Sequence, residues 1–176
     1  EISECLVGSE MCIRDSLIGM PGAGKSSVGV ILAKVLGYEF IDTDLVIQHR
    51  EKRLLREIIA DEGNEGFLAI ENEVNATLEA DKSVIAPGGS AIYGKEAMEH
   101  FKEIGTIVYL KLSYEDLAKR LGNLKGRGVV LKEGQTLKDL YDERSKLYEQ
   151  YAEITVDESG RDIQGTILAL REQIGM

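Results

Sequence analysis

The chain has 176 residues, of which 43% are hydrophobic, and this size and composition are typical of a single domain with a sizeable core. Its formal net charge is −10, so its surface repels phosphate backbones and we expect no nucleic-acid partner. No apolar run approaches the roughly 20 residues of a membrane-spanning helix, so we expect no membrane partner. The two cysteines, Cys5 and Cys12, lie outside any metal-ligand spacing, which fits the reducing cytoplasm. The expected oligomeric state is a monomer.

The first sixteen residues do not fit the pattern of the chain that follows. The glycine-rich loop at residues 19–26 needs a buried strand before it, and the expected strand contains the adjacent charges Arg14 and Asp15. Adjacent charges conflict with the continuous apolar character of a central parallel strand, so we expect this strand to be short or irregular. The stretch CLVGSEMCIRDS also resembles translated adapter sequence at the ends of some metagenomic gene predictions. We interpret residues 1–16 as non-native, with an ordinary polar extension as the alternative, and residues 17–176 as a single domain.

After the glycine-rich loop, helical and strand-like segments alternate along the chain. Apolar residues at helical spacing, together with composition and capping residues, predict helices over residues 25–36, 44–50, 54–61, 64–80, 95–103, 136–150 and 162–174, and a further one after Ser113. Short apolar runs predict strands over residues 38–41, 83–86, 106–112 and 153–156. This alternation indicates an α/β protein with a parallel sheet covered on both faces. Residues 122–134 carry four glycines without periodicity and are interpreted as a lid.

The segment GMPGAGKS, residues 19–26, matches the phosphate-binding pattern G-x-x-x-x-G-K-[ST] in full. Glycines let the backbone wrap closely around phosphates, and the helix that begins near Gly24 directs its positive end at them. We expect Lys25 to contact the β- and γ-phosphates and the Ser26 hydroxyl to bind Mg²⁺. A chance match in a chain of this length has a probability on the order of 1% or less. The predicted residues of this ATP site are Gly22, Ala23, Gly24, Lys25, Ser26 and Ser27.

Two carboxylates, Asp42 and Asp44, follow the second predicted strand in the sequence IDTD. Ligands of parallel α/β sheets gather outside the carboxyl ends of the strands, where this pair could hold Mg²⁺-bound water and a substrate hydroxyl. The structural alternative is that Asp44 caps the next helix and Asp42 forms a turn. The residues alone do not decide between these two interpretations.

Over residues 17–174 the chain resembles the shikimate kinases. The resemblance rests on five segments in order: GMPGAGKSS, LGYEFIDTD, VIAPGGSA, TIVYLKLS and ERSKLYEQYAEITVD. It implies a three-layer α/β/α P-loop kinase fold with a five-stranded parallel sheet in the order 2-3-1-4-5 and a mobile lid. The implied reaction transfers the γ-phosphoryl group of ATP, with Mg²⁺, to a hydroxyl of shikimate.

On the acceptor side, the resemblance assigns a role to each matching residue. Asp44 contacts the acceptor hydroxyls and helps to remove the proton, and Asp42 holds a Mg²⁺-bound water. Gly88 and Gly89 offer backbone N–H groups to the acceptor, and Arg144 binds its carboxylate. Without the resemblance, the two glycines would be a plain turn and Arg144 part of a solvated helix face.

On the nucleotide side, the resemblance makes Arg127 the lid arginine that closes on the transferring phosphate. Arg120 lies against the adenine, with a solvated helix face as its alternative. Lys25, Arg127 and Mg²⁺ would neutralise the charge on the moving phosphoryl group, which is the main task of a protein in phosphoryl transfer. Together with Asp44, Lys25 and Arg127 form the predicted catalytic set.

Three departures from the family pattern concern the acceptor and the lid. Leu68 stands where shikimate kinases carry a second carboxylate-binding arginine, Ser90 replaces a third glycine, and Gly128 replaces a proline. The acceptor could therefore be another small hydroxy acid, such as homoserine or gluconate, although the rest of the pattern favours shikimate. A nucleoside monophosphate kinase fits less well, because it would need a base-binding pocket and usually more lid arginines than this loop provides. A non-catalytic nucleotide-binding module also fits less well, because it would have little need of the acid pair, Arg127 and Arg144 together.

Overall fold

The computed structural model describes residues 14–122 and 131–174. The predictions for Cys5, Cys12, Arg127 and Gly128, and for most of the expected lid, therefore lie outside the described residues. The strands run parallel in one five-stranded sheet, and their order, β2-β3-β1-β4-β5, confirms the order expected from the resemblance. The strands are β1 (Arg14–Ile18), β2 (Glu39–Asp42), β3 (Ser83–Ala86), β4 (Thr106–Lys111) and β5 (Ile154–Asp157).

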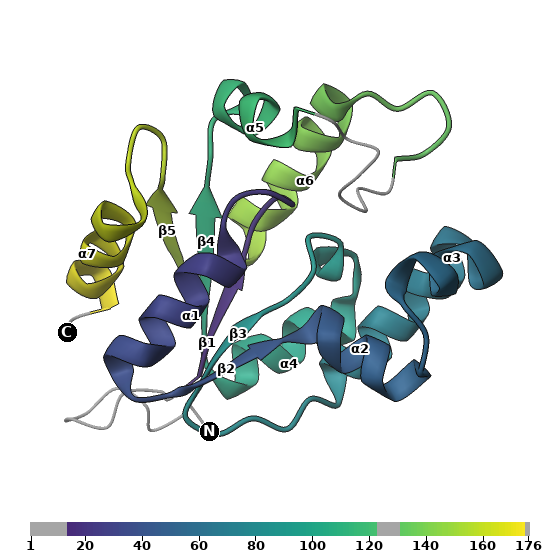
Figure 1. Cartoon of the computed structure of the whole chain (residues 1–176), viewed down its shortest axis with the longest axis horizontal. Helices are drawn as coiled ribbons and strands as arrows, with labels where there is room; N and C mark the ends of the chain where they lie inside the picture. The colour runs from purple at the N-terminus through teal and green to yellow at the C-terminus, as the bar shows by residue number, and fades with distance from the viewer. Residues whose placement is uncertain (1–13, 123–130, 175–176) are drawn as a thin grey trace.

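Helices cover both faces of the sheet, so the three-layer α/β/α architecture is also confirmed (Figure 1). One face packs against the first and last helices through side chains such as Leu32 and Leu170. The other face buries Phe101 and Tyr148 from two further helices. The helices are α1 (Lys25–Leu36), α2 (Thr43–Glu51), α3 (Leu55–Ala76), η1 (Ala91–Tyr93), α4 (Lys95–Ile104), α5 (Tyr114–Leu121), α6 (Leu137–Tyr151) and α7 (Ile163–Ile174).

The first strand is regular through its charged residues, and the expectation of an irregular strand there is wrong. Arg14 and Asp15 pair in parallel register with Ser83 and Val84 of β3, and Asp15 also pairs with Thr106 of β4. Backbone hydrogen bonding does not depend on side-chain polarity, so the ladder forms although the side chains are unsuited to it. The unfavourable feature of this strand is a buried carboxyl group, because Asp15 is only 3% exposed at the centre of the sheet.

Helices α2 and α3 pack on each other beyond the edge strand β2 and form a small core of their own around Ile58 and Phe67. The sequence predicted two helices over residues 54–61 and 64–80, and a break does occur between them. Gly63, within α3, has φ 70° and ψ −179°, a conformation that is essentially restricted to glycine. The kink divides α3 into two segments, and its second segment ends at Ala76 rather than at residue 80.

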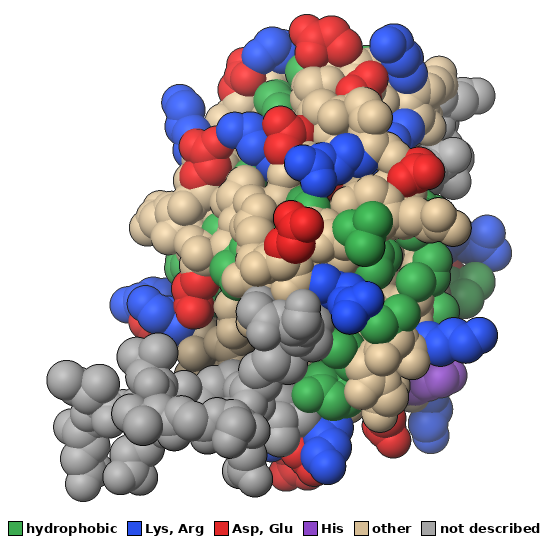
Figure 2. All heavy atoms as spheres, turned by 90° about the vertical axis from the view of Figure 1, so that its left-hand side faces the viewer, with side chains coloured by type: hydrophobic (Ala, Val, Ile, Leu, Met, Phe, Trp, Pro, Cys, Tyr) green, Lys and Arg blue, Asp and Glu red, His purple; other side chains and the backbone are tan. Residues whose placement is uncertain are grey.

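Viewed from the side of α7, acidic and basic side chains are interspersed over the surface, and hydrophobic side chains gather on part of it (Figure 2). Exposed apolar side chains of α1 and α7 include Val35 and Leu168, which are 52% and 60% exposed. Among the described residues, no helix combines the length and the apolar character that crossing a bilayer requires.

Candidate active site

The P-loop connects β1 to α1, and its backbone passes through conformations that favour glycine. Gly22 has φ 85° and Gly24 has φ 88°, a region that residues with a side chain rarely adopt. A Cβ atom on Gly22 would also lie 2.9 Å from Cδ2 of Leu121 in α5. Since α1 begins directly after Gly24, its free N–H groups and positive dipole end face the loop, as anion binding requires.

The Lys25 side chain lies inside this loop and is only 9% exposed. Its Nζ donates hydrogen bonds to the carbonyl oxygens of Gly19 at 2.8 Å and Met20 at 3.0 Å. Burial lowers the pKa of Lys25 to about 8, while the nearby Asp44 carboxylate acts in the opposite direction. The ammonium is thus a positioned charge with few protein partners, which suits contact with phosphate oxygens.

Ser26 and Asp42 bring two oxygen ligands together at the start of α1 and the end of β2. The Ser26 hydroxyl donates to Oδ2 of Asp42 at 3.2 Å, and Oδ1 of Asp42 accepts from the backbone N–H of Asp44 at 3.0 Å. Asp42 is therefore the N-cap of α2, so the structural alternative that gave this cap to Asp44 is wrong. A hydroxyl beside a carboxylate fits Mg²⁺, which binds few protein oxygens and keeps its remaining positions for water and phosphate.

Asp44 extends from the first turn of α2 towards the turn that follows β3. Burial raises the pKa of Asp44, Asp42 raises it further, and Lys25 lowers it. A Cβ atom on Gly88 would lie 2.8 Å from Oδ1 of Asp44 and 2.6 Å from Oε1 of Glu71. The turn thus passes too close to both carboxylates for any side chain, and this explains the glycine.

Glu71 is a buried acid of the site that the sequence analysis did not identify. It is 1% exposed on α3, and the Ser90 hydroxyl donates to its Oε2 at 2.6 Å. Burial raises the pKa of Glu71 to about 7, and the Ser90 hydrogen bond opposes this shift. Ser90, which replaces a family glycine, therefore helps to fix a carboxyl group beside Asp44 and Gly88. A buried acid in an acidic helix gives no distinctive sequence signal.

Arg144 is buried on α6 rather than solvated, with 4% exposure. Its Nε donates to the Tyr93 hydroxyl at 3.4 Å, and its guanidinium carbon lies 5.4 Å from the centre of the Tyr93 ring. Among the described residues, no carboxylate forms an ion pair with Arg144. A guanidinium withdrawn from water with one long hydrogen bond is suited to bind an anion.

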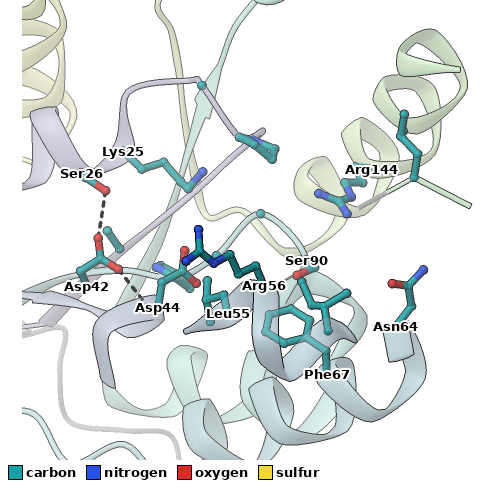
Figure 3. Close-up of a pocket in the computed structure, with 18 residues that line it drawn as sticks. Lys25, Ser26, Asp42, Asp44, Leu55, Arg56, Asn64, Phe67, Ser90 and Arg144 are labelled. Carbon is teal, nitrogen blue, oxygen red and sulfur yellow. Dashed lines mark hydrogen bonds between the residues drawn. The ribbon is translucent and has the colours of Figure 1, made fainter. Parts of the chain in front are cut away.

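A cavity of about 590 Å³ joins these groups. Its walls come from the P-loop, the ends of β2 and β3, α3 and α6, and Figure 3 shows its labelled side chains. The predicted site residues that line it are Gly22, Lys25, Ser26, Asp42, Asp44, Gly88, Gly89 and Arg144. Arg56, Asn64 and Phe67 of α3 also line the cavity, and they were not predicted as site residues because their local sequence does not distinguish them from other residues of this helix.

The remaining predicted residues lie elsewhere. Ala23 is buried within the P-loop, and Ser27 is exposed on α1. Arg120 of α5 reaches across the loop, where its Nη1 donates to the carbonyl oxygens of Gly22 at 3.5 Å and Ala23 at 3.4 Å. Leu68 lines an adjacent cavity of about 50 Å³, which shares Asn64, Phe67, Ser90 and Arg144 with the large one.

Known proteins resemble this chain in sequence and in fold. A family model described as shikimate kinase matches residues 21–174. Shikimate kinase 2 of Yersinia enterocolitica is 34% identical over 150 residues, which cover 80% of this chain and 84% of the relative. The structure of shikimate kinase from Acinetobacter baumannii in complex with shikimate is 33% identical, with a TM-score of 0.75, and the match covers 92% of this chain and 89% of that one. Shikimate kinase from Aquifex aeolicus is 28% identical with a TM-score of 0.75, covering 92% of this chain and 96% of that one. The chain therefore belongs to the shikimate kinase family.

Proposed function

We propose that this chain transfers the γ-phosphoryl group of MgATP to a hydroxyl group of shikimate. The observation that carries the proposal is the single cavity in which the buried, unneutralised Arg144 faces the phosphate-binding Lys25 and the acid Asp44. A carboxylate held at Arg144 would place the hydroxyl groups of a small acid towards Asp44. The Acinetobacter baumannii relative, whose structure contains shikimate, supports this choice of acceptor.

The nucleotide would be held at the P-loop by the N–H groups at the start of α1 and by the Lys25 ammonium. Mg²⁺ would be held by Ser26 directly and by Asp42 through water, and it would neutralise charge on the phosphates. Arg120 already lies against the loop and would contact the nucleotide from the α5 side. Arg127, in the expected lid, stays a prediction for the phosphate that is transferred.

The chemical step needs one proton acceptor and an aligned hydroxyl. The acceptor oxygen forms a bond to the γ-phosphorus, the bond from that phosphorus to its bridging oxygen breaks, and ADP leaves. The hydroxyl proton passes to Asp44, whose pKa is raised by burial, which makes it a better base than an exposed aspartate. Lys25 stabilises the charge that moves onto the leaving group.

Gly88 and Gly89 would position the acceptor in this scheme. Their turn lies between Asp44 and Arg144, since a Cβ atom on Gly89 would lie 3.2 Å from Nη1 of Arg144. The Tyr148 hydroxyl of α6 donates to the carbonyl oxygen of Gly89 at 2.6 Å, and this hydrogen bond holds the turn in place. Backbone N–H groups of the turn are then available to acceptor oxygens.

The test is an ADP-release assay of the full chain with MgATP and a panel of acceptors: shikimate, homoserine, gluconate and nucleoside monophosphates. We expect turnover with shikimate well above that with the other acceptors. Turnover with homoserine or gluconate instead would mean that Leu68 marks a changed acceptor pocket. Turnover with a nucleoside monophosphate, or none with any acceptor, would contradict the proposal. A monomeric state and a cytoplasmic location stay predictions.

A further inference from the structure

The acceptor cavity contains a second arginine that the family resemblance does not assign. Leu68 occupies the position where shikimate kinases carry their second carboxylate-binding arginine, and it lines the small neighbouring cavity instead. Arg56, in the first turn of α3, lines the large cavity together with Arg144. Figure 3 shows the two arginines reaching the cavity from different helices, α3 and α6.

Arg56 differs from its neighbouring arginines in its partners. Arg50 is paired with Glu73 at 2.6 Å, and Arg53 lies 3.1 Å from a carboxylate oxygen of Glu62. Neither Arg50 nor Arg53 lines the cavity. For Arg56, by contrast, the described part of the chain provides no ion pair. The one arginine of this group that is not neutralised by a protein carboxylate is thus the one that faces the acceptor site.

The other cations near the site are already engaged. Lys25 is held by two carbonyl oxygens of the P-loop, next to the phosphates that it would bind. Lys132 lines only the small cavity, and its Nζ lies 3.8 Å from a carboxylate oxygen of Glu143. Arg56 and Arg144 are therefore the described cations of the large cavity that remain for an acidic acceptor.

We infer that Arg56 binds the carboxylate of the acceptor together with Arg144, in place of the family arginine that Leu68 replaces. The inference rests on the proposed function and explains how a shikimate kinase tolerates that replacement. The Arg56 side chain is exposed and long, so it can close on a bound carboxylate from the side of α3, while buried Arg144 holds it from the side of α6. Two guanidinium groups also fix the orientation of a carboxylate better than one.

The test compares shikimate with its methyl ester, in which the carboxylate charge is absent. In the wild-type chain we expect a clear preference for the acid in kcat/KM. Arg56→Ala should raise the KM for shikimate about tenfold or more, as expected for loss of a charged hydrogen bond, and should leave the KM for the ester and for MgATP nearly unchanged. Arg56→Lys, which keeps the charge but not the planar fork, should lose less.

Two further variants make the test specific. Arg50→Ala removes an arginine of the same region that does not line the cavity, and it should keep the wild-type preference for the acid. Leu68→Arg in the Arg56→Ala background should restore part of the lost affinity for shikimate, because it returns an arginine to the family position.

The outcomes separate this inference from the proposed function. If the wild-type chain does not phosphorylate shikimate, the proposed function fails, whatever Arg56 does. If it does, and Arg56→Ala keeps the full preference for the acid over the ester, the inference is overturned. An equal loss of kcat with acid and ester would overturn it too, since Arg56 would then act on the transferred phosphate.

Discussion

At the scale of single residues, the site depends on cations that are withdrawn from water. Lys25 is 9% exposed and Arg144 is 4% exposed, and such groups are costly to bury unless partners offset the lost hydration. Two carbonyl oxygens of the loop partly replace the lost hydration of Lys25. Among the described side chains, Arg144 donates one long hydrogen bond, of 3.4 Å, to the Tyr93 hydroxyl. Under the proposed function, anionic ligands would complete both environments. Folding has already removed the two cations from water, so ligand binding would not have to desolvate them again.

We expect the charge of Lys25 to make the binding of MgATP depend on pH. Burial lowers the pKa of Lys25 to about 8, so the free enzyme loses this positive charge as pH rises through about 8. We expect kcat/KM for MgATP to fall above that pH, by up to about tenfold for each pH unit. Because bound phosphates stabilise the ammonium, kcat at saturating MgATP should stay constant to higher pH. Steady-state kinetics from about pH 6 to about pH 10 measure both, and a kcat/KM that is constant over this range contradicts the assignment.

The residues whose position in the fold could be predicted from the sequence are those whose geometry is local, and their roles in binding stay predictions. The P-loop motif placed Lys25 and Ser26 because eight consecutive residues determine their arrangement. Glu71 and Arg56 could not be predicted in the same way. Both lie on the charged helix α3, where nothing in the local pattern separates a cavity-facing side chain from a solvated one. Arg56 lines the cavity and Glu71 is buried beside Gly88 and Ser90. Both positions follow from the packing of α3 against α2 and α4, which involves residues far apart in sequence.

At the scale of elements, the central strand β1 is unusual because polar residues occupy buried positions where a parallel sheet normally has apolar side chains. Asp15 and Ser16 are 3% and 0% exposed, and Ser16 Oγ has no hydrogen-bond partner among the described residues. The conflict is visible in the sequence, but the expected consequence, an irregular strand, is wrong, because the ladder forms regardless of it. The same burial supports the interpretation of residues 1–16 as non-native, which stays a prediction.

Replacing Asp15 should stabilise the protein in a manner that depends on pH. Burial raises the pKa of Asp15 from 3.8 to about 6, so the folded state binds its proton more tightly than the unfolded state. The resulting penalty is absent below about pH 4, grows as pH rises to about 6 and then stays at about 3 kcal/mol. Asp15→Asn should therefore raise the free energy of unfolding at neutral pH and change it little at about pH 4.

Denaturant unfolding at the two pH values measures this difference. Asp15→Val should add a gain at both pH values, since a β-branched apolar side chain suits the centre of a parallel sheet. A gain for Asp15→Asn that is equal at neutral and acidic pH would show that Asp15 does not carry the proposed proton.

The kink of α3 should influence the shape of the acceptor pocket, because two residues that line it, Arg56 and Phe67, stand before and after Gly63 in the sequence. Gly63→Ala should lower the free energy of unfolding by about 1–3 kcal/mol, since alanine disfavours φ 70° with ψ −179° although open space surrounds the site. It should also raise the KM for shikimate several-fold, because relaxation of the backbone turns the two segments of α3 relative to each other. Gly37→Ala is the matched control.

Gly37 has φ 69° at the end of α1, also in open space, and lies outside the cavity. Its replacement should cost stability without changing the KM for shikimate. Thermal unfolding and steady-state kinetics on both variants decide the matter. If Gly63→Ala loses stability but keeps the wild-type KM, the kink is a structural feature without influence on the acceptor.

The pattern of strands and helices in the sequence predicted the type of sheet but not the order of its strands. Alternating strands and helices predicted a covered parallel sheet, and the separate helices predicted over residues 54–61 and 64–80 already implied a break before residue 64. The alternation did not determine the order β2-β3-β1-β4-β5, because the sequence of a parallel strand does not specify which strands become its neighbours. That order followed from the resemblance of the whole chain to one family.

At the scale of the whole molecule, a chain with a net charge of −10 has to bind two anionic substrates. Lys25, Arg56 and Arg144 line one cavity, and under the proposed function these three cations would bind both substrates. Local charges in a partly dry cleft act over short distances and outweigh the diffuse field of a screened surface. The excess negative charge is the reason why we expect no nucleic acid or other polyanion to bind.

The most direct measurement is the identity of the phosphorylated product. The full chain is incubated with MgATP and shikimate as the sole acceptor, and the products are analysed by mass spectrometry and phosphorus NMR. We predict one phosphorylated shikimate for each ADP formed, and loss of both products in the Lys25→Ala variant, which should keep the fold. ADP formed without phosphorylated shikimate, or a folded Lys25→Ala variant that turns over at the wild-type rate, would contradict the account.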